Sequence, residues 1–200
     1  MKNFMVILLV VAFFPAVAVT GTIGIGGKAT FTDVKMQDVS GEKYSLADVA
    51  KENGLLVMFS SNTCPFVLQW ESRYIELKTW ADQHGVGMIV LNSNYGNRDG
   101  VDSFEEMKKR ARENNYNFPY VVDEESQIAN AFGGQTTPHV FLFDKNMELV
   151  YKGAIDDNYK SATGVKKAWA KDAVASLANG EKIAVAETKP VGCSIKRKLN

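Results

Sequence analysis

Cys64 stands at the junction between an apolar run and an amphipathic run, a position that suits reactive thiol chemistry. The segment 55–59 is continuously apolar, which is typical of a strand buried on both faces. Apolar residues then recur at helical spacing from Val67 to Ala81, and Pro65 falls where the first helical residue would be. Unpaired N–H groups at a helix start favour an anion and lower the pKa of a thiol. We therefore expect Cys64 to supply a thiolate near neutral pH.

The alternative for Cys64 is a small buried hydrophobic residue, which is what a free cysteine most often is. A dithiol motif is absent, because Val67 stands three residues after Cys64. The second of the two cysteines is Cys193, in a C-terminal stretch that reads as a mobile tail. Cys193 is a candidate resolving thiol; its alternatives are a free tail cysteine and one that pairs between molecules.

The N-terminus reads as a targeting segment. Lys2 precedes an apolar run over 4–14, and small residues follow Pro15, so we expect a signal peptide over 1–18 and export to the periplasm or the medium. The alternative is a retained anchor, but no basic cluster follows the run. We expect a flexible leader over 19–30, one domain over 31–180 and a tail over 181–200. After cleavage we expect no membrane association.

Composition excludes several partners. Lysine plus arginine number 23 and aspartate plus glutamate 23, so no basic excess points to nucleic acid or anionic lipid. The glycine-rich stretch 21–28 lacks the first glycine and the Ser/Thr of a phosphate loop. We expect no nucleotide, flavin or other cofactor.

The remaining pattern predicts alternating strands and helices. A helix follows Ser103, which with Glu106 forms a plausible capping box. Further elements are expected as a hairpin over 34–45, a helical turn over 46–53, strands over 86–92, 118–123, 139–144 and 148–153, and helices over 126–132 and 164–178. This order describes an α/β fold, a central mixed sheet with helices on both faces.

At this point the chain resembles the thioredoxin superfamily, and more closely its redoxin branch, the peroxiredoxin-like proteins related to alkyl hydroperoxide reductase and thiol-specific antioxidant. The resemblance covers roughly Thr32 to the C-terminus. It is carried by the segments 59–67, 70–74, 118–120, 137–138, 142–144, 153–157 and 192–196. It implies a thioredoxin-like fold in which Cys64 is the reactive cysteine and Thr137-Pro138 is a Thr-cis-Pro pair facing it. There the backbone before the proline would pair with an extended substrate; the alternative for Pro138 is an ordinary edge-strand or turn proline.

The chain also departs from these relatives. They often have cysteines where Ser61 and Thr136 stand here, so the local thiol partners are lost. Ser61 and Cys64 keep the (Ser/Thr)-x-x-Cys spacing of true peroxiredoxins, in which Ser61 would hydrogen-bond a peroxide. Val57, however, replaces a proline of those enzymes, and no arginine lies between positions 112 and 197 to match their activating one.

Two functions follow. The first is an exported thiol oxidoreductase in which Cys64 attacks a disulfide or peroxide, Cys193 resolves the product, and Ser61, Thr63, Thr137 and Pro138 contact substrate. Its partners would be a thiol or disulfide protein or a small oxidant, and a thiol reductant that the sequence does not name. The second is a non-catalytic binding protein, for instance a metal or thiol carrier using Cys64 and His139, with Cys193 as a further ligand. His139 is more often a packing residue at a strand start, and His84 reads as a helix-end residue.

Overall fold

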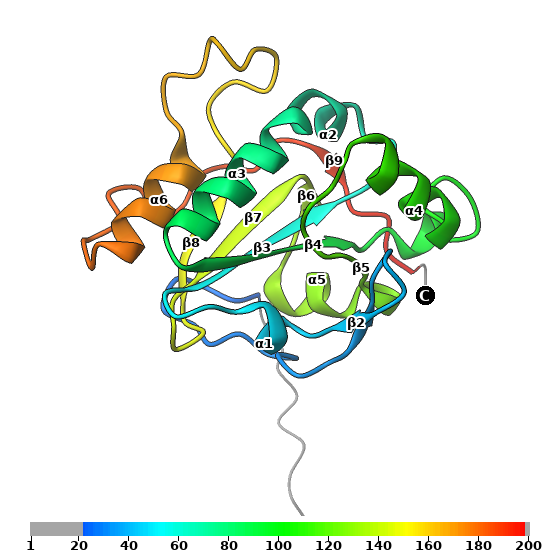
Figure 1. Ribbon diagram of the computed structural model, residues 1–200, viewed down its shortest axis with the longest axis horizontal. Coiled ribbons are helices and arrows are strands. Elements are labelled where there is room, and N and C mark those ends of the chain that lie inside the picture. The colour runs from blue at the N-terminus through cyan, green and yellow to red at the C-terminus, as the bar shows by residue number, and fades with distance from the viewer. Residues whose placement is uncertain (1–21, 199–200) are drawn as a thin grey trace, which may run out of the picture.

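Five strands form the central sheet of the computed structural model, which describes residues 22–198 (Figure 1). Their spatial order is β5 (Tyr120–Val122), β4 (Val86–Asn92), β3 (Gly54–Ser60), β7 (His139–Phe143) and β8 (Leu149–Gly153). β3, β4 and β5 run parallel, whereas β7 and β8 are antiparallel to their neighbours. The predicted mixed sheet is confirmed.

Two smaller sheets flank the central one. One pairs β1 (Met36–Gln37) with β2 (Lys43–Tyr44), as the predicted hairpin requires. The other pairs β6 (Thr136–Thr137) with β9 (Cys193–Ser194) and joins the C-terminal tail to the segment before β7.

Helices cover both faces of the central sheet, as predicted. They are α1 (Leu46–Val49), α2 (Pro65–Trp70), α3 (Ser72–Gln83), α4 (Phe104–Glu113), α5 (Gln127–Phe132) and α6 (Trp169–Ala178), with 3₁₀ turns η1 (Tyr95–Asn97) and η2 (Glu124–Ser126). Strand β3 shows how the layers form, because alternate side chains point to opposite faces. Leu56 and Met58 pack in the cluster with α2, α3, α4 and α6, and Leu55, Val57 and Phe59 pack in the one with α1 and α5.

Two helix boundaries differ from prediction. The amphipathic run after Cys64 is divided at Glu71 into α2 and α3. The last helix begins at Trp169 rather than near residue 164. Residues 164–168 stay outside the helix, because the Lys166 backbone N–H donates to the Asp157 carboxylate and the Lys167 carbonyl accepts from the Asp157 backbone N–H.

The expectation of a flexible leader over 19–30 is also corrected for the described residues of that segment. Gly26 N–H donates to the Leu149 carbonyl and Leu149 N–H to the Gly27 carbonyl, both at 2.8 Å. β8 is an edge strand, so the backbone groups on its outer side have no partner within the central sheet. This segment pairs with those of Leu149. The expected signal peptide over 1–18 lies outside the described residues.

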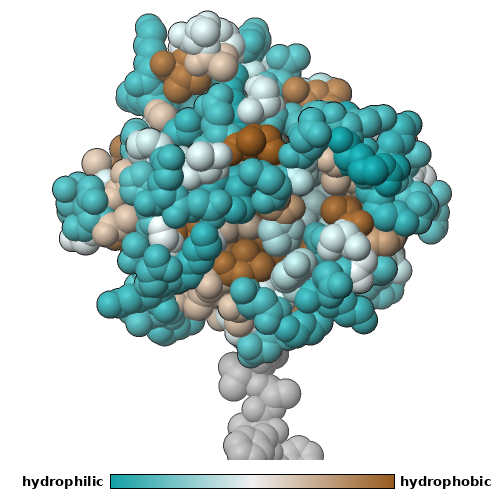
Figure 2. All heavy atoms as spheres, in the orientation of Figure 1, coloured by the Kyte–Doolittle hydropathy of each residue, from teal (hydrophilic) through white to brown (hydrophobic). Residues whose placement is uncertain are grey.

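Within residues 22–198, no helix has the length and apolar character to cross a membrane. The face shown in Figure 2 is mostly hydrophilic, with apolar residues exposed in small separate patches.

Candidate functional site

Cys64 ends the turn that connects β3 to α2. It is the N-cap residue, with Pro65 as the first residue of the helix, as the sequence predicts. Its side chain is only 5% exposed. The thiol therefore lies at a helix start but is buried.

The Cys193 thiol is in contact with that of Cys64. Its sulfur lies 2.7 Å from the Cys64 sulfur, although the two residues are 129 positions apart. The pairing of β6 with β9 causes this approach, because it sets Cys193 directly opposite Thr137. The Cys64 thiol in turn donates to the Thr137 carbonyl oxygen, 3.0 Å away. Both are free thiols.

Three of the four residues expected to contact substrate lie around Cys64. The buried Ser61 hydroxyl accepts a hydrogen bond from the Cys64 backbone N–H at 3.2 Å and lies 3.4 Å from the Thr137 hydroxyl. The Thr137–Pro138 peptide bond is cis, as the resemblance implied. Thr63 is exposed and instead lines a groove of 380 Å³ beside α4.

The two thiols differ in acidity. Burial raises the pKa of Cys64, but hydrogen bonds from the Cys193 thiol and the Val67 backbone N–H more than offset burial, so this pKa lies below its ordinary value. Burial, together with the neighbouring Cys64, raises the pKa of Cys193 to about 11. Of the two sulfurs, Cys64 is therefore the one that loses its proton first, while Cys193 keeps its own.

A buried polar network that the sequence did not reveal fixes the turn before Cys64. The Asn62 backbone N–H donates to the Asp102 carboxylate at 2.8 Å, and the Tyr120 hydroxyl donates to the Asn62 side-chain oxygen at 2.9 Å. Asp102 is fully buried and also accepts from the Asn92 and Asn94 amides. The sequence could have indicated this contact through the order of its elements. Neighbouring parallel strands end at the same edge of a sheet, so the polar loop after β4 must lie beside the turn after β3.

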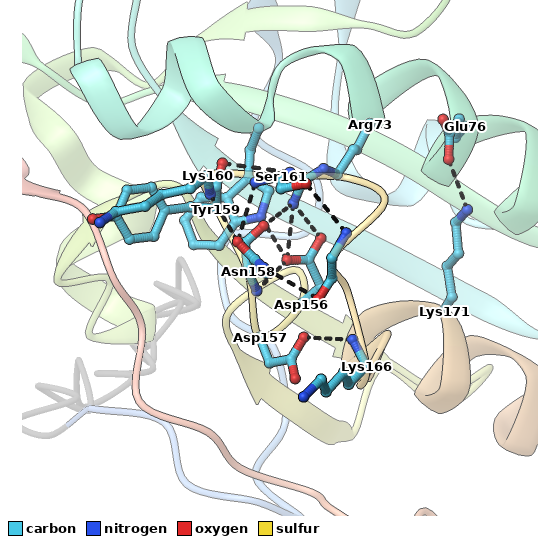
Figure 3. Close-up of polar contacts among 12 residues, drawn as sticks. Arg73, Glu76, Asp156, Asp157, Asn158, Tyr159, Lys160, Ser161, Lys166 and Lys171 are labelled. Carbon is cyan, nitrogen blue, oxygen red and sulfur yellow. Dashed lines mark hydrogen bonds and ion pairs between the residues drawn. The ribbon is translucent and has the colours of Figure 1, made fainter.

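Two ion pairs hold the junction of α2 and α3, one partly buried and one buried. Glu71 binds the Arg110 guanidinium of α4. Arg73 binds Asp156 at 2.7 Å (Figure 3). The Trp70 indole N–H donates to the same carboxylate. The reactive turn thus precedes a helix junction whose orientation is set by two charged contacts.

His139 does not join the sulfurs in a metal site. Its Nδ1 accepts the Gln135 backbone N–H at 3.1 Å, and its ring packs on Phe141 with centroids 4.5 Å apart. Among the described residues, no three His, Cys, Asp or Glu side chains are grouped to hold a metal ion. His84 caps the end of α3, with Nδ1 2.7 Å from the Trp80 carbonyl oxygen.

Comparisons with known proteins agree with this fold. A sequence model of the AhpC/TSA family matches residues 26–152. An uncharacterised conserved protein from Geobacillus kaustophilus is 30% identical, covering 90% of this chain and 95% of its own, with a TM-score of 0.82. A hypothetical protein from Sinorhizobium meliloti is 28% identical over 90% of this chain and 98% of its own, with a TM-score of 0.81.

The peroxidoxin BcpB from Mycobacterium tuberculosis shares the fold at 13% identity, over 78% of this chain and 96% of its own, with a TM-score of 0.59. Among curated proteins, no relative matches.

Proposed function

Because the chain belongs to the AhpC/TSA family of thioredoxin-like proteins, we propose that it is an exported thiol-dependent oxidoreductase in which Cys64 and Cys193 form the redox pair. The observation that carries the proposal is the 2.7 Å approach of the two sulfurs. The apolar run near the N-terminus supports export.

The pKa difference assigns a role to each sulfur. A thiolate is the attacking species in thiol–disulfide exchange, so Cys64, whose pKa is lowered, attacks first. Its sulfur bonds to one sulfur of the substrate disulfide and releases the other as a thiolate, which takes up a proton. Cys193 then loses its proton and attacks the Cys64 sulfur, releasing the second substrate thiol. Two electrons pass from the cysteine pair to the substrate, and an external thiol must later return them.

Peroxide is the second candidate substrate, and the family supports it. The Cys64 thiolate would take the outer oxygen and release an alcohol or water, and Cys193 would convert the sulfenic acid into a disulfide with loss of water. The arrangement of positive charge favours disulfide chemistry instead. Arg197, the tail arginine, donates to the Gly134 carbonyl and to Asn130, and Arg98 donates to the Asp102 carbonyl. The hydrogen bonds of both guanidinium groups thus go to groups other than the two sulfurs.

Stoichiometry tests the proposal. Fully reduced protein is mixed with a small symmetrical disulfide such as hydroxyethyl disulfide, and released thiol is counted per chain. Wild type is expected to release two thiols, Cys193→Ser one, and Cys64→Ser none. A wild type that releases only one thiol, or a Cys64→Ser protein that releases one thiol as fast as Cys193→Ser does, would contradict the proposal. A parallel assay with hydrogen peroxide decides the substrate: consumption much faster than disulfide reduction would make peroxide the substrate.

A further inference from the structure

The edge that a thioredoxin-like site would offer to an extended substrate is already occupied by this chain. Strand β9 pairs with β6 in antiparallel register, Cys193 opposite Thr137 and Ser194 opposite Thr136. The Ile195 backbone N–H continues the pairing to the Gln135 carbonyl at 3.1 Å. The backbone next to the cis-proline is therefore already paired with β9.

The same tail is held on its other side by the loop after β4. Gly96 N–H donates to the Lys196 carbonyl at 2.7 Å, and Lys196 N–H donates to the Asn94 side-chain oxygen at 2.9 Å. The tail thus lies between two segments that border the site, and both hydrogen-bond to it.

Side chains anchor the tail as well. Ile195 is buried, 5% exposed, in the apolar cluster that contains Phe59 and Phe132. Arg197 donates to the Asn130 side chain at 2.6 Å and to the Gly134 carbonyl. The expectation of a mobile tail is therefore wrong for the residues around Cys193. An extended peptide would have to displace this packed segment before it could pair with β6.

We propose that residues 192–197 determine specificity by closing the β6 edge, so that Cys64 accepts small disulfides and discriminates against extended polypeptide disulfides. This inference rests on the proposed function and names its substrate class. A small disulfide needs access to the Cys64 sulfur alone, whereas a peptide reacts only in the fraction of molecules whose tail is displaced. Its apparent rate is reduced to that fraction of the rate for an open site.

Two reagents that release the same leaving group test the inference. Both are mixed disulfides of 5-thio-2-nitrobenzoate, one with N-acetylcysteine amide and one with an extended peptide of about ten residues carrying a central cysteine. They are used on Cys193→Ser protein, in which Cys64 is the remaining cysteine. Released chromophore gives both rates, and their ratio reports access rather than leaving-group chemistry.

The intact tail is expected to slow the peptide by about tenfold or more relative to the small reagent. Adding Ile195→Ala and Arg197→Ala removes two side-chain contacts that hold the tail. The ratio of the peptide rate to the small-reagent rate should then move towards one, while the rate of the small reagent changes little. Hydrogen exchange at residues 194–196 reports the release of the tail. The matched control is Val185→Ala, an exposed apolar residue of the same tail, which should leave the ratio unchanged.

Equal rates for both reagents with the intact tail would overturn the inference while leaving the proposed function in place. The inference would also be overturned if hydrogen exchange showed that the tail had been released and the ratio of the two rates nevertheless stayed the same. Failure of Cys64 to react with either reagent in every variant would instead overturn the proposed function, and the inference with it.

Discussion

Gly192 lies so close to Thr137 that a Cβ atom at position 192 would stand 2.3 Å from the Thr137 carbonyl oxygen. That distance is below any normal contact, and the Thr137 carbonyl also accepts the Cys64 thiol. The residue before Cys193 therefore has to be glycine for β9 to reach the site. The close approach is a backbone contact, so it cannot be relieved by rotation of a side chain.

Gly192→Ala should accordingly separate the two sulfurs without disturbing the central sheet. We expect disulfide formation between Cys64 and Cys193 to slow by about tenfold or more, because the sulfurs no longer meet in the ground state. Stopped-time alkylation after addition of oxidised glutathione measures the rate. Gly100→Ala is the control, since its nearest neighbour would be 3.8 Å away, an ordinary contact. Equal rates in the two variants would contradict the argument.

The acidity of Cys64 should depend on the hydrogen bond from position 193. We expect the pH midpoint of iodoacetamide labelling at Cys64 to lie below the ordinary value of about 8.5. Labelling is slow below the midpoint, where the thiol is protonated, and fast above it. Cys193→Ala should move the midpoint upwards relative to Cys193→Ser, because serine keeps a donor. Identical midpoints would show that the donor at position 193 has no influence.

Arg73 and Asp156 should be stability residues of the helix junction. Asp156→Leu leaves the Arg73 charge buried and unpaired, so it should lower the free energy of unfolding by about 3 to 5 kcal/mol. The double variant Arg73→Met/Asp156→Leu should recover part of that loss. Glu76→Gln is the control, since it breaks the more exposed Lys171–Glu76 pair (Figure 3) and should cost about 1 kcal/mol or less. Urea unfolding measures all three, and a cost for Glu76→Gln that equals that of Asp156→Leu would contradict the assignment.

His139 should make the protein sensitive to acid. Burial, together with Lys152, lowers the pKa of His139 to about 3, whereas an unfolded histidine titrates near 6.5. Between these values the unfolded state binds a proton that the folded state does not, so stability falls as pH falls from about 6.5 towards 3. His139→Gln keeps an acceptor for Gln135 and cannot titrate. Urea unfolding at several pH values should show a smaller loss in this variant, and an equal loss would assign the acid sensitivity to other groups.

Much of the architecture could be predicted because it is local or periodic. The change from an apolar run to helical spacing, with Pro65 at the change, located the strand, the helix and Cys64 between them. The burial of Leu55 to Phe59 on both faces of the sheet follows from the same run. Fold class required only the order of such elements.

The position of Cys193 could not be predicted, because it depends on long-range pairing. β6 and β9 are two residues each and carry no hydrophobic pattern that sets a register. The tail therefore reads as mobile, although Ile195 buries in the core and fixes it. Asp102 was missed for a related reason: a single carboxylate in a polar loop gives no sign that it will be fully buried beneath the reactive turn.

The central claim is that Cys64 and Cys193 form one redox pair within a chain. Non-reducing peptide mapping of the whole protein after oxidation by diamide at low protein concentration tests it most directly. The account predicts a single cross-linked species joining the peptides of Cys64 and Cys193. Dimers linked through Cys193, or over-oxidised Cys64 beside a free Cys193, would contradict it.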